Sequence, residues 1–224
     1  MEEEASMITV ALPAGRMLEE AARALGLAGY DCPYDKDSRK LIFDGGNVRY
    51  LIARPSDVPV YVARGAADVG IVGKDGLSES GEQVYELMDL GFGRCRFVLA
   101  APEDDVPALK EVLNAGGMLT KLRIATKFPS ITRDYAAGKV MRPEIIVLKG
   151  AVELAPAIGL ADAIVDIVES GKTLAENGLA IVEQISESSA RLIANRSSYG
   201  IKAKPIADLM ERMGASGRTG GGIR

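Results

Sequence analysis

The sequence predicts an α/β fold with mainly parallel sheets, and three observations carry that prediction. Short apolar runs rich in β-branched residues alternate with amphipathic stretches along the chain. Hydrophobic residues make up 47% of the 224 residues, which is enough to build sizeable cores. A weak internal repeat also aligns the segment at 65–72 with the one at 159–166, which would fit two similar lobes. Sheets of this kind bind ligands beyond the carboxyl ends of their strands, so we look for the site in those loops.

Seven apolar runs are expected to form strands, and five amphipathic stretches between them are expected to form helices. The expected strands cover 8–12, 50–53, 69–72, 97–101, 122–125, 145–148 and 163–167. The expected helices cover 17–25, 58–64, 106–115, 132–137 and 152–158. Residues 1–6 are polar and residues 215–224 are rich in glycine and charge, so we expect both ends to be disordered.

Two pairs of segments indicate an internal repeat. A Gly-x-Ala-Asp turn ends at Asp68 before one expected strand, and another ends at Asp162 before a second. The strands before 13–16 and before 127–129 repeat a scheme of strand, loop and helix. Two similar lobes facing a shared cleft would explain both pairs, whereas the alternative is a common helix-end turn that is used twice. We expect both aspartates to fix their turns rather than to bind a ligand.

Composition excludes several classes of function. A net charge of −4 and a pI near 5.1 give no general attraction to nucleic acid or to anionic membranes. The chain has no histidine, which removes Ser-His-Asp and Cys-His catalysis and most zinc sites. Cys32 and Cys95 lack the spacing of a metal or redox pair and are expected to be free thiols. An acidic start and the lack of an apolar run of about 18 residues predict a cytoplasmic protein without a membrane span.

The segment from Asp166 to Thr173 is the most informative candidate site. An expected strand runs into Ser170-Gly171-Lys172-Thr173, and a helix that begins there would direct backbone N–H groups and two hydroxyls at a phosphate. The triplet Gly-Lys-Thr resembles the end of a Walker A loop, but Asp166 stands where that loop needs its first glycine. A carboxylate suits a ribose hydroxyl or Mg²⁺ instead. We interpret the loop as a sugar-phosphate site, against the alternative of an ordinary capped turn.

Three arginines form the second candidate cluster: Arg16, which follows Leu12-Pro13-Ala14-Gly15, Arg39 and Arg54. Arg54 lies between an expected strand and an expected helix, where its planar guanidinium can bind pyrophosphate through two parallel hydrogen bonds. Taken alone, each of the three is more simply explained as a solvated surface charge.

Together the motifs resemble those of the ATP phosphoribosyltransferases of histidine biosynthesis. The matching segments are Leu12-Pro13-x-Gly15-Arg16, Ser38-Arg39-x-Leu41, 54–59, 65–75, 125–129, and above all 152–174, with 190–196 resembling the closing strand. They follow one another in family order over about residues 7 to 204. Ala14 departs from the family pattern, which commonly has lysine there, so one cationic contact to ATP is in doubt.

The resemblance implies two lobes like those of type II periplasmic binding proteins, with the active site in the cleft between them. Lobe I, on the ATP side, would comprise 1–95 and 180–224. Lobe II, which carries the phosphate loop, would comprise 96–179. In the implied reaction, N1 of the ATP adenine attacks C1 of phosphoribosyl pyrophosphate (PRPP) and expels pyrophosphate, with Mg²⁺ on the phosphates. A neutral ring nitrogen is the nucleophile, so a chain without histidine can perform this chemistry by positioning and electrostatics.

The resemblance also assigns roles to individual residues. The catalytic charges would be those of Arg39 and Arg54. PRPP would be bound by Asp166, Glu169, Ser170, Gly171, Lys172 and Thr173. ATP would be bound by Leu12, Gly15, Arg16, Asp75 and Lys127. The protein alone would fix no metal, and Asp166 would be the one candidate ligand for the Mg²⁺ that the substrate phosphates carry.

The resemblance is to the short-form catalytic subunit, which implies a homodimer that works with a separate regulatory subunit related to histidyl-tRNA synthetase. No nucleic acid or membrane partner is expected. One alternative is a two-lobed small-molecule binding module without catalysis, which would need a signal peptide or an attached DNA-binding helix pair. The other is a phosphoribosyltransferase that uses a different base as acceptor. An assay with ATP, PRPP and Mg²⁺ would separate these classes.

Overall fold

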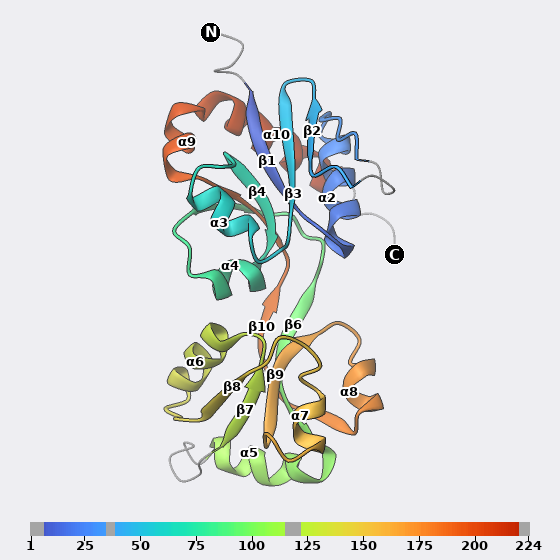
Figure 1. Cartoon of the computed structure of the whole chain (residues 1–224), viewed down its shortest axis with the longest axis vertical. Helices are drawn as coiled ribbons and strands as arrows, with labels where there is room; N and C mark the ends of the chain where they lie inside the picture. The colour runs from blue at the N-terminus through green and yellow to red at the C-terminus, as the bar shows by residue number, and fades with distance from the viewer. Residues whose placement is uncertain (1–6, 35–38, 115–121, 220–224) are drawn as a thin grey trace. The chain divides into compact units, whose positions relative to one another are not determined.

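The computed structural model describes residues 7–34, 39–114 and 122–219, and these divide into two compact units (Figure 1). Unit 1 lies within Met1–Gly93 and Ser189–Arg224, and unit 2 is Arg94–Ser188. Each unit has its own mixed sheet with helices on both faces. In the described part of the chain, no helix is long and apolar enough to span a membrane.

Unit 1 is built on a six-stranded sheet in the order β2-β3-β1-β4-β11-β5. The strands are β1 (Ile8–Pro13), β2 (Ile42–Gly45), β3 (Val48–Ala53), β4 (Val69–Gly73), β5 (Tyr85–Asp89) and β11 (Ala190–Ala194). Strand β1 runs parallel to β3 and to β4, whereas β2, β11 and β5 join antiparallel to their neighbours. The carboxyl ends of β1, β3 and β4 therefore share one edge of the sheet.

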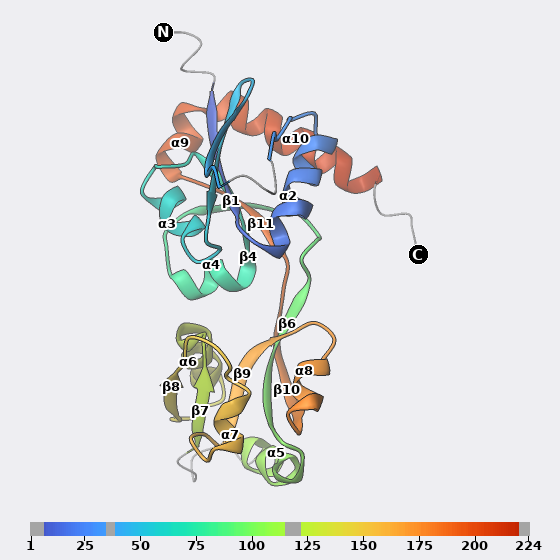
Figure 2. The same cartoon turned by 45° about the vertical axis from the view of Figure 1, so that its right-hand side comes forward.

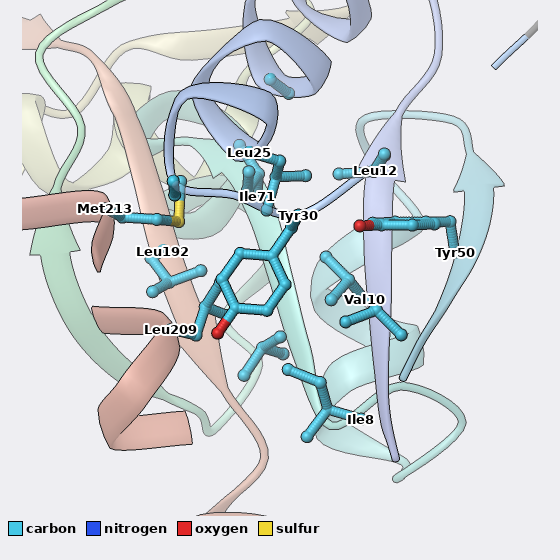
Figure 3. Close-up of a cluster of buried hydrophobic side chains, with 14 of the residues drawn as sticks. Ile8, Val10, Leu12, Leu25, Tyr30, Tyr50, Ile71, Leu192, Leu209 and Met213 are labelled. Atoms are coloured by element: carbon cyan, nitrogen blue, oxygen red, sulfur yellow. The ribbon is translucent and has the colours of Figure 1, made fainter. Parts of the chain in front are cut away.

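Five helices cover this sheet: α2 (Arg16–Leu27), α3 (Val58–Ala63), α4 (Lys74–Ser80), α9 (Arg196–Ile201) and α10 (Ala203–Thr219). Successive side chains of β1 point to opposite faces of the sheet, and different helices cover the two faces. Val10 and Leu12 pack with residues of α2 and α10 on one face (Figure 3). Ala11 packs with residues of α3 and α4 on the other face, and Figure 2 shows these two pairs of helices on either side of β1. Each fully buried aliphatic side chain in these layers contributes about 1.5–3 kcal/mol to stability.

Unit 2 is built on a five-stranded sheet in the order β10-β6-β9-β7-β8. The strands are β6 (Cys95–Pro102), β7 (Arg123–Thr126), β8 (Glu144–Val147), β9 (Ala163–Val168) and β10 (Leu179–Ser188). Strand β7 runs parallel to β8 and β9, and β6 runs antiparallel to β9 and β10. Helices α5 (Val106–Asn114) and α6 (Pro129–Gly138) pack on one face, and α7 (Leu154–Ala157) and α8 (Lys172–Glu176) pack on the other.

The α/β class and all seven expected strands are confirmed, but the expectation of mainly parallel sheets is wrong. Only β1 and β7 pair with parallel neighbours on both sides among the described strands. The antiparallel additions β2 and β5 were missed because their exposed polar residues leave no continuous apolar run. Strand β10 begins with the apolar run 179–182 but was missed because mostly polar residues follow it. Strand β10 also shifts the expected lobe boundary, since its pairing with β6 places residues 180–188 in unit 2.

The carboxyl-terminal segment is more ordered than the sequence predicts. Disorder is expected over 215–224, but helix α10 continues to Thr219. The helix is anchored further back, where Ile206, Leu209 and Met213 bury one helical stripe against the core of unit 1. The expectation of disorder for 1–6 and for 220–224 falls outside the described residues.

Candidate active site

Strand β9 and the turn that follows it carry the predicted phosphate loop. Asp166 lies within β9 with its side chain 14% exposed, and its Oδ1 accepts a hydrogen bond from the backbone N–H of Ile167 at 2.8 Å. After the buried Val168 the chain turns outward, and Glu169 and Ser170 are exposed. Helix α8 then begins at Lys172. The strand thus holds a carboxylate at a fixed place, and the exposed loop begins three residues beyond it.

Gly171 gives this loop its shape. It precedes α8 in the left-handed conformation, with φ of 80° and ψ of 0°, where residues with a side chain are strained. The helix has no side-chain cap at Gly171, and Ser170 Oγ makes only a long contact of 3.4 Å with the N–H of Lys172. Thr173 and the Lys172 side chain are exposed. The first turn of α8 therefore presents backbone donors, a hydroxyl and an ammonium to solvent, which is a suitable environment for a phosphate.

Lys127 and Asp166 lie together, which the sequence did not predict. Strands β7 and β9 are parallel neighbours, so the residue after β7 comes close to the end of β9. The Nζ of Lys127 lies 3.3 Å from Oδ1 of Asp166, and it also lies 6.0 Å from the ring centre of Phe128. The sequence predicts that Lys127 binds ATP and that Asp166 binds PRPP. In the structure both residues lie in unit 2, beside the loop of residues 169–173.

In unit 1, the predicted Gly15 loop connects β1 to α2. Gly15 has φ of 87° and ψ of −148°, a region that is essentially restricted to glycine. The N–H of Ala14 donates to the carbonyl of Ala53 at 2.7 Å, which ties the end of β1 to the end of β3. Arg16 is exposed at the start of α2. The expected contact between Leu12 and ATP is not supported. Leu12 is completely buried in the core of unit 1, so its side chain is not available to a ligand.

Arg54 follows β3 directly and its side chain is exposed. Its carbonyl accepts the N–H groups of Asp57 and Val58, so the turn before α3 fixes its backbone. Arg39 is also exposed, and the antiparallel register of β2 on β3 continues through Leu41, whose carbonyl accepts the N–H of Ile52. If the same register continues, Arg39 lies opposite the carboxyl end of β3, next to Arg54, which follows that strand. Within the described residues, no ion pair or hydrogen bond involves either guanidinium.

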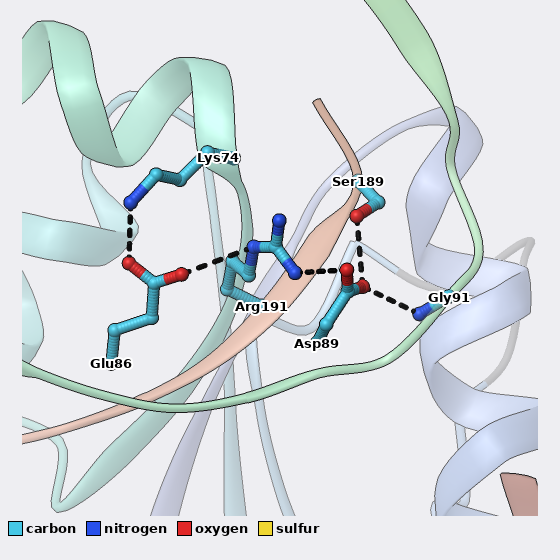
Figure 4. A network of polar contacts seen from close by, with 6 residues as sticks. All are labelled: Lys74, Glu86, Asp89, Gly91, Ser189 and Arg191. Atoms are coloured by element: carbon cyan, nitrogen blue, oxygen red, sulfur yellow. Dashed lines mark hydrogen bonds and ion pairs between the residues drawn. The ribbon is translucent and has the colours of Figure 1, made fainter. Parts of the chain in front are cut away.

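Asp75 lies in the first turn of α4, after β4, and its carboxylate folds over Gly73 so closely that a side chain on Gly73 would collide with it. Figure 4 shows the polar network beside this helix start. The Lys74 ammonium pairs with Glu86, which also faces Arg191 Nε at 3.2 Å. The N–H of Lys74 donates to the carbonyl of Ser189 at 2.9 Å. These contacts fix the orientation of the turn that carries Asp75.

Asp89 completes this network. It pairs with Arg191, and its Oδ1 accepts hydrogen bonds from the N–H of Gly91 at 2.9 Å and from Ser189 Oγ at 2.8 Å. Burial alone raises the pKa of Asp89, but these hydrogen bonds outweigh it and lower the pKa. No local pattern predicted this network, because β5, which carries Glu86 and Asp89, is a polar edge strand.

The described residues contain no group of three or more Asp, Glu, Cys or His side chains close enough to hold a metal ion. Asp166 offers a hard carboxylate oxygen from β9 beside the phosphate loop, and Glu169 offers a second, exposed one within the loop itself. Mg²⁺ prefers six oxygens and commonly takes most of them from phosphates and water. Asp166 therefore fits one position on a metal ion whose other ligands come from a substrate.

The family model HisG, described as ATP phosphoribosyltransferase, matches residues 54–215. The chain belongs to the ATP phosphoribosyltransferase family. An ATP phosphoribosyltransferase of Rubrobacter xylanophilus is 44% identical over 216 residues, which cover 96% of this chain and 99% of that protein. One of Symbiobacterium thermophilum is 47% identical over 212 residues, covering 93% of this chain and 94% of that protein.

Among solved structures, the ATP phosphoribosyl transferase (HisG:HisZ) complex from Thermotoga maritima contains a chain that is 33% identical, with a TM-score of 0.79. The similarity covers 95% of this chain and 100% of that one. A histidine kinase sensor domain with similarity to periplasmic binding proteins has a TM-score of 0.61 at 15% identity, covering 96% of this chain and 91% of that one, and it shows the fold alone. The two-lobed fold and the family expected from the motifs are confirmed. The chain is a pentosyltransferase of the first step of histidine biosynthesis.

Proposed function

We propose that this chain condenses ATP with PRPP to give phosphoribosyl-ATP and pyrophosphate, and that residues 169–173 bind the 5′-phosphate of PRPP. The conformation of Gly171 is the observation that carries this assignment. Its left-handed backbone leaves the start of α8 open, with exposed Ser170 and Thr173 hydroxyls on either side. A phosphate bound there would place the attached ribose toward Asp166, whose carboxylate can accept hydrogen bonds from the ribose hydroxyls.

The reaction needs positioning and charge more than proton transfer. The adenine N1 is a neutral nucleophile, and pyrophosphate leaves with developing negative charge, so preorganised cations lower the barrier. We assign this role to Arg39 and Arg54, which the β2–β3 register brings to the same end of β3. We assign ATP to Gly15, Arg16 and Asp75 in unit 1 and to Lys127 in unit 2. We assign Leu12 no direct contact with ATP, because it is completely buried near the end of β1.

Mg²⁺ is the proposed cofactor, carried on the substrate phosphates. When bound, it neutralises charge on the phosphates and on the leaving pyrophosphate. Asp166 would supply the protein's oxygen ligand, and the neighbouring Lys127 limits the net negative charge at that point. The ion pair thus lets a single carboxylate serve a ribose or a metal without repelling phosphate.

For partners, we propose a homodimer of this chain that associates with a regulatory subunit of the HisZ type, related to histidyl-tRNA synthetase. The Thermotoga maritima structure is a HisG:HisZ complex, and this chain spans the full length of its similar chain. The Rubrobacter relative is likewise covered over 99% of its length, which supports the short form. ATP and PRPP are intracellular metabolites, so we place the reaction in the cytoplasm.

Incubation of the purified chain with ATP, PRPP and Mg²⁺ tests this function, with the ultraviolet absorbance of the product as the readout. Parallel reactions replace ATP with GTP, with ITP or with free adenine. Product from ATP alone is the expected result. Product only from another acceptor would make the chain a different phosphoribosyltransferase. Binding of both substrates without turnover under any of these conditions would favour a two-lobed binding module.

A further inference from the structure

Thr126, the last residue of β7, is a polar residue with 0% of its surface exposed. Its hydroxyl donates a hydrogen bond to the carbonyl oxygen of Val165 at 2.7 Å. The same hydroxyl accepts a hydrogen bond from the backbone N–H of Phe128 at 2.9 Å. A hydroxyl has a single proton to donate, and here it is used on the neighbouring strand β9. The side chain therefore joins β9 to the turn that leaves β7.

Both hydrogen bonds end next to a residue that we assign to a substrate. Val165 immediately precedes Asp166, and Phe128 immediately follows Lys127. The ammonium of Lys127 and the carboxylate of Asp166 lie 3.3 Å apart. One buried hydroxyl thus fixes the backbone beside each member of this ion pair.

A simpler explanation would make Thr126 an ordinary turn residue before α6. Threonine often bonds to the N–H two residues further on, and that habit accounts for the bond to Phe128. It does not account for the bond to Val165, which crosses from β7 to a residue 39 positions away. The Thr132 hydroxyl donates to the carbonyl of Phe128 at 2.7 Å, but this local bond lies within the start of α6 and does not join the turn to β9. The ring of Phe128 packs edge-on against Phe97.

We propose that Thr126 is a positioning residue for the transferase reaction. Its hydroxyl holds the turn of Lys127 against β9, so that Lys127 and Asp166 present their charges to the substrates at a fixed separation. This role rests on the proposed function, which places both residues at the substrates. Displacement of a positioned group by about 1 Å can cost roughly a hundredfold in rate, so a small shift of the turn is measurable.

Three variants test the role: Thr126→Val, Thr126→Ser and, as a matched control, Thr132→Val. Thr132 is also completely buried and also loses one hydroxyl, but its bond lies within the start of α6 and does not reach β9. The affinity for PRPP with Mg²⁺ is measured by calorimetry, kcat and KM by the product assay, and melting temperature by circular dichroism. We expect Thr126→Val to lower kcat/KM for PRPP by roughly tenfold or more, within the range that a displacement of this size produces. Thr126→Ser should stay near wild type, and so should Thr132→Val.

Equal kinetic losses in Thr126→Val and Thr132→Val would overturn the role, and so would a loss in Thr126→Ser as large as in Thr126→Val. If Thr126→Val does not fold, Thr126→Cys replaces it, since a thiol is a weaker donor of similar size. The variant Asp166→Asn distinguishes failure of the positioning role of Thr126 from failure of the proposed PRPP site. If Asp166→Asn weakens PRPP binding but Thr126→Val does not, only the role of Thr126 is refuted. If Asp166→Asn binds PRPP as wild type does, the proposed site fails and the positioning role fails with it.

Discussion

The carboxylate of Asp68 accepts a hydrogen bond from the backbone N–H of Thr9 at 2.8 Å, while the carbonyl of Thr9 accepts the N–H of Asp68 at 2.9 Å. Unit 2 repeats this arrangement with Asp162 and Arg123, whose two corresponding hydrogen bonds each measure 2.9 Å. In both units, an aspartate that precedes one strand thus makes two hydrogen bonds to the start of the parallel neighbouring strand, β1 in unit 1 and β7 in unit 2. The repeated Gly-x-Ala-Asp turns are therefore structural, as expected for these aspartates.

Asp68 should matter for stability and not for chemistry. It is 7% exposed, and it also accepts hydrogen bonds from the Ser198 hydroxyl and the Lys202 ammonium. Asp68→Ala removes the acceptor of these partly buried donors, although Lys202 Nζ keeps its hydrogen bond to the carbonyl of Met7 at 2.9 Å. The variant should lower the free energy of unfolding by about 1–3 kcal/mol. Urea denaturation at pH 7 measures this loss. Turnover per folded molecule should remain near that of wild type.

The control for Asp68 is Asp44→Ala, which breaks an exposed pair with Arg49 and should change stability little. If both variants lose the same stability, the hydrogen bonds of Asp68 contribute nothing. If Asp68→Ala abolishes turnover in a fully folded protein, Asp68 belongs to the active site.

Asp162 predicts a specific dependence of stability on pH. The hydrogen bond from Arg123 lowers the pKa of Asp162 from its ordinary value of 3.8. A lowered folded-state pKa stabilises the protein above that ordinary value, and the contribution is lost as the pH falls through the folded-state pKa. The Asp162 side chain is 40% exposed, so solvent screens the pair and the effect is modest. Urea denaturation of wild type and Asp162→Asn should show a constant difference from pH 7 to 5 that shrinks below pH ~4. A difference that grows in acid would contradict this assignment.

Arg54 should matter for turnover and not for folding. Removing one donor directed at developing charge typically costs about a hundredfold to a thousandfold, so Arg54→Ala should lower kcat by that order. Arg54→Lys should recover only part, because an ammonium cannot reproduce two parallel hydrogen bonds. Arg64→Ala is the matched control, since Arg64 is equally exposed but lies at the opposite end of α3. Comparable losses of activity in Arg54→Ala and Arg64→Ala would exclude a specific role for Arg54.

Inhibition by histidine should require the regulatory partner. Feedback inhibition needs a second site whose occupancy favours one state of the enzyme. We propose that a HisZ-type subunit, related to histidyl-tRNA synthetase, supplies this histidine site. Initial velocities of the chain alone should not change with millimolar histidine, whereas those of the reconstituted complex should fall. Equal inhibition of both would place a histidine site within this chain.

The sequence predicted those parts of the fold that are buried on both faces. Strands β1, β4 and β9 are short apolar runs because helices cover each side of them, and such runs are easily recognised. Strand β10 was missed because only its first four residues form an apolar run, and Glu183 and Glu187 interrupt the pattern beyond them. Tertiary pairing with β6, which no local pattern encodes, makes it a strand.

The same distinction holds for the candidate site. The loop around Gly171 was predictable because a glycine, a hydroxyl and a lysine at the end of a strand form a local pattern. The proximity of Lys127 to Asp166 was not, because it depends on the register of β7 on β9. The bond from Thr126 to Val165 depends on the same register. The burial of Leu12 could not be predicted either, because a leucine just before a loop can point into the core or toward the loop.

Calorimetric titration of Gly171→Asp tests the central claim most directly. A carboxylate at position 171 would both strain the left-handed backbone and repel the phosphate from the start of α8. Gly178→Asp is the control, because Gly178 has a similar φ of 66° with open space around it and lies beyond the end of α8. We expect Gly171→Asp to lose PRPP binding and keep ATP binding, and Gly178→Asp to bind both substrates. Wild-type affinity for PRPP in folded Gly171→Asp would contradict the assignment of this loop to the phosphate of PRPP.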